Sequence, residues 1–146
     1  VLTGEERAEA ALEMARQQAD AAAEQTRRRT EQALLSSFNS EAELRRVFDE
    51  RLTLSENNVQ TARYNVTSLR QGLATLLGQA GERELQGQKV SEDNAKAILQ
   101  RKRELDSQIR LLGIFEQQRR ELDSEIEQTL TRYRELKASE QATAAR

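Results

Sequence analysis

The chain has 146 residues, of which 36% are hydrophobic and only 3% aromatic. This is too little bulky apolar surface for a compact multilayer core, so we expect an elongated molecule. The 23 basic and 25 acidic side chains are interspersed, which excludes the one-sided field that a nucleic-acid backbone requires. His and Cys are absent, which removes the commonest general base, the usual nucleophile arrangements and nearly every zinc site. We expect no enzyme, no metal, no cofactor and no nucleic-acid partner.

Helix formers dominate the composition, with no Pro and only six Gly. The net charge of −2 and the periodic apolar residues favour a solvated helical surface over disorder, although 33% of the residues are charged. No stretch reaches the roughly 20 apolar residues of a membrane span, and no signal-peptide pattern is present. The sequence starts at Val1, so a leader, an anchor or a further domain upstream stays open.

The first predicted element is an Ala-rich helix over residues 4–36, with a junction up to residue 39. Thr3 and Glu6 have the capping-box spacing that marks a helix start. The apolar stripe of this helix is formed mainly by small side chains, so each turn can bury little apolar surface. The stripe consists of Ala8, Leu12, Ala15, Ala19, Ala22, Thr26 and Ala33. Such a stripe permits close approach to another helix without selecting one. Two arrangements stay open: the helix folds onto the rest of the chain, or it pairs with another copy.

Three large apolar residues lie beside the break that follows this helix. In one interpretation Phe38 is a hydrophobic staple that covers the first turn of the next helix, against Leu44. In the other, Leu34, Leu35 and Phe38 are exposed together and bind a protein partner. These three residues are the candidate partner-binding site.

Residues 40–137 are predicted to form a long antiparallel coiled-coil hairpin. Ser40 marks the start of its first arm, over 41–86. In this arm small or apolar residues recur alternately three and four apart, as in a heptad seam, at Phe48, Leu52, Ser55, Val59, Ala62, Val66, Leu69, Leu73, Leu76 and Ala80. The arm ends in a turn near 87–91, after a segment that contains several glycines.

The second arm of the hairpin is predicted over residues 92–137, after a helix start at Ser91. Its seam repeats every seven residues from Ile98 to Tyr133, and its apolar stripe is wider, with flanking residues at Ile109, Phe115, Leu122, Leu130 and Leu136. A frayed tail is expected over 138–146. The fold class is therefore all-α, a long antiparallel helical hairpin with an additional Ala-rich N-terminal helix.

Folding the chain about residue 89 aligns the two seams layer by layer, which is the predicted register. Arg119 interrupts the second seam, where Leu or Ile would be expected. Because an unpaired buried guanidinium is costly, this side chain either points outward into water or finds a carboxylate. We predict a register-fixing ion pair with Glu56, which lies within one turn of the facing position.

The pattern Leu-Leu-x-x-Phe-x-Ser-Glu from Leu34 to Glu41, followed by two heptad arms, resembles the helical region of uncharacterised proteobacterial periplasmic coiled-coil proteins. The resemblance covers about residues 30–137. Members of this domain-of-unknown-function family have a signal peptide and a small β-rich N-terminal domain before the hairpin. The resemblance implies a periplasmic location, with the cytoplasm as the alternative, and brings no established activity.

A helical rod without a pocket acts through its surface. We therefore expect a non-catalytic scaffold, spacer or adaptor of the bacterial envelope that works through protein–protein contacts with an unidentified partner. A homo-oligomer, with a dimer favoured, would cover the apolar stripes that one hairpin leaves open. The alternatives are a tip-docking hairpin like those of efflux adaptors and a membrane-surface-associated helical protein. Direct membrane contact is not expected, because the first helix lacks large apolar residues and carries acidic as well as basic side chains.

Overall fold

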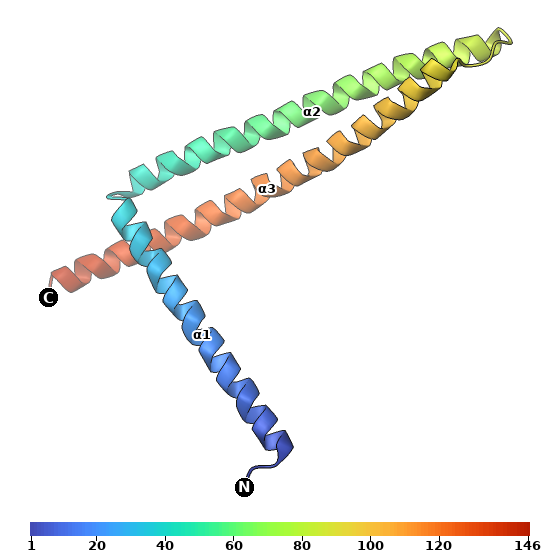
Figure 1. Cartoon of the computed structure of the whole chain (residues 1–146). Coiled ribbons are helices and arrows are strands. Elements are labelled where there is room, and N and C mark those ends of the chain that lie inside the picture. Colours follow the sequence, from blue (N-terminus) through green and yellow to red (C-terminus); the bar gives the residue numbers. More distant parts are fainter. The chain divides into compact units, whose positions relative to one another are not determined.

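The computed structural model describes residues 1–146 and is 90% helical, without strands (Figure 1). It contains three α-helices, α1 (Gly4–Ser37), α2 (Glu41–Leu85) and α3 (Glu92–Ala144). The all-α fold with a helical hairpin is as predicted. None of the three helices has a segment apolar enough to cross a membrane. The chain divides into two compact units, which we call the junction unit (Val1–Arg46 with Gln128–Arg146) and the hairpin unit (Val47–Glu127).

The helix starts follow the capping signals in the sequence. Thr3 Oγ1 accepts a hydrogen bond from the Glu6 amide at 3.2 Å, and the Glu6 carboxylate accepts one from the Thr3 amide at 3.1 Å. This closes the predicted capping box at the start of α1. The hydroxyls of Ser40 and Ser91 each accept a hydrogen bond from the amide three residues later, at the starts of α2 and α3.

The turn between α2 and α3 is closed by backbone hydrogen bonds around Gly87. The amide of Gln88 donates to the Arg83 carbonyl at 2.9 Å, and the amide of Gly87 donates to the Glu84 carbonyl at 3.0 Å. Gly87 has a φ of 74°, in the left-handed region that glycine enters without steric cost. This helix-ending motif stops α2 at Leu85, one residue before the predicted end.

The C-terminal segment is helical to Ala144, although the sequence predicts a frayed tail from residue 138. No Gly or Pro interrupts these residues, so nothing stops the helix after residue 137. Lys137 and Glu140 form an ion pair at 3.7 Å one turn apart, which adds local support. The helical C-terminus is a correction to the prediction.

In the hairpin unit, α2 and α3 pack antiparallel along the predicted seam (Figure 1). Every position of the α2 seam that the sequence identifies is buried or half-buried. Val59, Ala62 and Val66 are the most enclosed, with exposed fractions of 7%, 2% and 4%. The alternating spacing of three and four residues therefore identifies the core of this unit correctly.

The leucines of the seam are less enclosed than its smaller residues. Leu69, Leu73 and Leu105 are only half-buried, because two helices cover a side chain from two directions and leave its flanks open. Ile109, predicted to flank the seam of α3, is exposed. The stripe on α3 is therefore narrower than the sequence suggested.

Leu122 is 6% exposed in the hairpin unit, whereas Leu54 is 64% exposed. We expect Leu122→Ala to lower the free energy of unfolding by about 2–5 kcal/mol, because the substitution leaves a cavity in the seam. Leu54→Ala should change it by less than about 0.5 kcal/mol. Urea unfolding followed by far-ultraviolet circular dichroism measures both. Similar losses in the two variants would show that the seam lies on another face.

Candidate partner-binding site

Tyr133 is the centre of the junction unit and is only 2% exposed. Its hydroxyl donates a hydrogen bond to the Phe38 carbonyl at 2.9 Å. Phe38 has left the helical conformation, so its carbonyl has no partner within α1 and depends on this contact. Leu44 and Leu130 are also buried in this unit. The end of α1, the start of α2 and the end of α3 thus share one small core.

An ion pair holds α1 against α3 beside this core. Arg132 Nε donates to Glu31 Oε1 at 2.7 Å, and its Nη1 donates to Glu135 Oε2 at 3.0 Å. The Glu31 side chain is 18% exposed and the Arg132 side chain 41%, so the carboxylate is partly sheltered while the guanidinium faces water. The hydrogen bond from Arg132 lowers the pKa of Glu31, and the two carboxylates raise the pKa of Arg132. The guanidinium is therefore already occupied by carboxylates of its own chain.

An open groove of about 530 Å³ runs between α1 and α3 in the junction unit. Its apolar wall consists of Ala33, Leu34 and Phe38. Charged and polar side chains surround this wall, namely Arg27, Thr30, Glu31, Ser37, Gln128, Thr129 and Arg132. We call this feature the junction groove.

The structure brings two of the three predicted partner-binding residues into the junction groove. Leu34 and Phe38 line it, while Leu35 is half-buried but does not. Phe38 is half-buried, so it lies between the two interpretations, a covered staple and a free anchor. No sequence pattern indicated the contribution of α3, including Thr129 and Arg132. The heptad position of Tyr133 was the signal for a buried residue here, but no pattern linked it to the end of α1.

The structure also brings together the predicted register pair in the hairpin unit. Arg119 Nη2 lies 3.1 Å from Glu56 Oε1, across the two helices. The opposite guanidinium nitrogen, Nη1, lies 2.5 Å from Asp123 Oδ1 one turn away. That nitrogen is enclosed and has no aligned hydrogen bond, so this second contact is an ion contact. The two carboxylates, that of Asp123 first, raise the pKa of Arg119.

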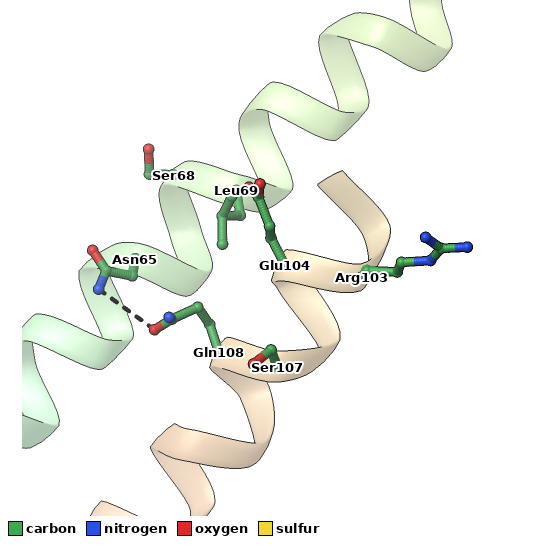
Figure 2. A pocket seen from close by; sticks show the side chains of 7 residues that line it. All are labelled: Asn65, Ser68, Leu69, Arg103, Glu104, Ser107 and Gln108. Carbon is green, nitrogen blue, oxygen red and sulfur yellow. Dashed lines mark hydrogen bonds between the residues drawn. The ribbon is translucent and has the colours of Figure 1, made fainter. Parts of the chain in front are cut away.

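Two further polar contacts cross the hairpin unit. Arg51 binds Glu125 with two hydrogen bonds of 2.9 and 3.0 Å, a geometry with fixed orientation. Asn65 Nδ2 donates to Gln108 Oε1 at 3.5 Å in an open groove of about 520 Å³ (Figure 2). Folding the chain about residue 89 predicts residue 127 opposite Arg51 and residue 113 opposite Asn65, so the observed partners lie two and five positions from the predicted ones. They indicate a defined register along the unit.

The groove in Figure 2 offers little chemistry beyond hydrogen bonding. It is lined by two amides, two serines, one leucine and one oppositely charged pair of residues, that is Asn65, Gln108, Ser68, Ser107, Leu69, Arg103 and Glu104. No group of three acidic residues in the chain is placed to hold a metal ion. The junction groove has the larger apolar wall and is the better candidate for binding a protein.

Comparison of the chain with protein-family models, with curated proteins and with solved structures found no match. The geometry of the two units is therefore the basis for the function proposed below.

Acidification should weaken the contact between α1 and α3. The depressed pKa of Glu31 means that its ionised form adds stability at neutral pH. This contribution is lost as the pH falls through the folded-state pKa, below about 4.5. We expect the NMR signals of Leu34 and Phe38 to shift in this range. The transition should vanish in Glu31→Gln and persist in Glu135→Gln, and a transition unchanged in Glu31→Gln would contradict the assignment.

Arg119 should matter more for register than for stability. Arg119→Leu replaces a partly exposed ion pair by an apolar seam residue, so the free energy of unfolding should stay within about 1 kcal/mol or rise. Glu56→Gln combined with Asp123→Asn leaves the guanidinium in the seam without a carboxylate. That variant should lose about 1 kcal/mol or more. Urea unfolding measures the free energy of unfolding of both variants. A larger loss in this free energy for Arg119→Leu than for the double variant would show that the pair is mainly a source of stability.

Proposed function

We propose that this chain is a non-catalytic helical scaffold or adaptor of the bacterial envelope that binds a protein partner in the junction groove. The observation that carries the proposal is the apolar wall of Ala33, Leu34 and Phe38, open to solvent between two helices. An apolar strip between helices suits an amphipathic helix, which inserts large side chains at helical spacing. The envelope location rests on the family resemblance of residues 30–137.

The charges around the groove define the chemistry of the partner. Arg132 already binds Glu31 and Glu135, and Arg27 binds Glu24 at 2.6 Å. A charged partner would have to displace these internal pairs, at a cost in free energy. The contacting face of the partner helix should therefore be apolar, with uncharged polar residues on either side. Those residues would match the hydroxyls and the amide of Thr30, Thr129 and Gln128.

The groove also favours binding over catalysis. Its polar groups are hydroxyls, one amide and ions that are already paired, with no nucleophile next to a general base. The chain has no His or Cys that could supply either role. A scaffold requires only a rigid surface of this kind.

The test starts by identifying the partner. A photo-crosslinking amino acid at Ala33, in the native envelope, should label a helical protein, and mass spectrometry should place the crosslink in an amphipathic helix. The partner is then purified and its affinity measured by calorimetry. Phe38→Ala and Leu34→Ala should each raise the dissociation constant by about tenfold or more, as expected for a central apolar contact.

The matched control is Leu12→Ala, which removes a leucine from the same helix at a position that is 71% exposed. It should leave the affinity unchanged. Equal binding of the purified partner to Phe38→Ala, Leu34→Ala and the unchanged chain would reject the groove as the docking site. Crosslinks confined to cytoplasmic proteins would reject the envelope location.

A further inference from the structure

The polar contacts between α2 and α3 lie in one half of the hairpin unit. Three such contacts join the two helices within this unit, and the one nearest the turn is the hydrogen bond between Asn65 and Gln108 (Figure 2). Over residues 67–107, between this contact and the turn, no hydrogen bond or ion pair joins α2 to α3. We call residues 67–107 the hairpin tip, and residues 47–66 with 108–127 the hairpin base. Only the base has its two helices fixed by polar contacts.

The hairpin tip also has fewer buried residues than the hairpin base, although the two parts are of nearly equal length. Ala80 is the only buried residue of the tip. The base contains five buried residues, namely Phe48, Val59, Ala62, Val66 and Leu122. The larger seam residues of the tip, such as Leu73 and Leu105, are half-buried. Since stabilisation grows with the apolar area removed from water, closing the tip gains less free energy than closing the base.

Three glycines lie within α2 in the hairpin tip, namely Gly72, Gly78 and Gly81. Glycine in a helix interior disfavours the helix by about fivefold relative to alanine. A Cβ atom at any of the three positions would meet no atom within 4 Å, and none of the three has a positive φ. Neither packing nor backbone conformation within the chain therefore requires glycine here. This part of α2 is a weaker helix than the fold needs.

Close approach of another molecule does not explain the three glycines together. Gly72 and Gly81 are nine residues apart, which is about two and a half turns of an α-helix, so they lie on opposite sides of α2. No single partner helix can reach both sides at once. The effect that the three glycines share is the loss of helix stability.

We propose that the hairpin tip is a conformational device that opens while the hairpin base stays paired. The missing polar contacts, the low burial and the three glycines all favour opening of the same segment. Most of the stability of a helix in a protein comes from the packing of its apolar side, so the α2 part of the tip should unwind when the seam separates. Segments with few buried apolar contacts open at a lower free energy than the rest of a fold.

Opening of the tip changes which apolar side chains the chain presents. It uncovers Leu73, Leu76 and Leu105, which the closed seam keeps half-buried. The hairpin unit would then be a rod with a stiff base and a tip that alternates between a closed and an open form. This property goes beyond the proposed scaffold function and does not involve the junction groove.

The test is amide hydrogen exchange of the full-length chain under native conditions. Residues 73–84 and residues 55–66 belong to the same helix, so their protection factors can be compared directly. We expect the protection of residues 73–84 to be lower by at least about tenfold, because this segment opens without the base.

Gly72→Ala/Gly78→Ala/Gly81→Ala should close the tip. Each alanine favours the helix by about fivefold, so exchange of residues 73–84 should slow by at least about tenfold, up to the protection of the base. Gly87→Ala should have the opposite effect, because Gly87 in the turn has a φ of 74° that alanine adopts only with strain. Exchange of the tip should become faster by about fivefold or more in this variant.

The matched control is Gly113→Ala, which makes the same substitution in the hairpin base. A Cβ atom at Gly113 also meets no atom within 4 Å, so this variant should stabilise α3. It should leave exchange of residues 73–84 unchanged, because opening of the tip does not unfold this part of α3.

Equal protection of the two segments in the wild-type chain would overturn the proposal. So would a triple alanine variant whose tip exchanges as fast as that of the wild type. If Gly113→Ala slowed exchange of the tip, the tip would open only when the whole hairpin unit unfolds, which also overturns the proposal. Phe38→Ala should leave exchange of the tip unchanged, so failure of this device and failure of the junction groove are distinguishable.

Discussion

Two helices can cover a side chain from only two directions, and most features of this chain follow from that constraint. In the hairpin unit the small seam residues Val59, Ala62 and Val66 are enclosed, whereas the larger Leu69 and Leu73 stay half-buried. A third helix or a further layer of secondary structure would be needed to cover the flanks of these leucines. Each half-buried leucine therefore contributes less than its full burial free energy, and the remaining apolar surface is left for contacts with other molecules.

Such an open seam also leaves the alignment of the two helices weakly defined by apolar contacts alone, because a shift by one heptad would again pair leucines with leucines. Polar residues remove this ambiguity. A shifted register would separate Arg119 from Glu56 and Arg51 from Glu125, leaving guanidinium groups beside apolar residues. The pairs add little stability, since they are partly exposed, but they penalise every other alignment.

Local patterns predicted most of the fold, because the interactions that decide it are local. The capping box of Thr3 and Glu6 and the heptad spacing of α2 each involve residues within a few turns. The closeness of Arg119 to Glu56 followed from extending that spacing through one turn. The hydrogen bond from Tyr133 to Phe38 could not be found this way, since it joins residues 95 positions apart through a contact that no repeat encodes. The helical C-terminus was missed because a weak apolar pattern was read as the end of the helix, although no residue there breaks one.

The charges around the junction groove are satisfied within the chain, and this determines how a partner would be held. Around the junction groove, Arg132 and Arg27 are already paired within the chain, so a partner gains mainly from apolar contact with Leu34 and Phe38. Salt screens exposed charges over about 10 Å at 0.1 M ionic strength but hardly affects apolar contact. Raising the salt concentration should therefore leave the partner bound in the junction groove, because its binding free energy would come mainly from apolar contact.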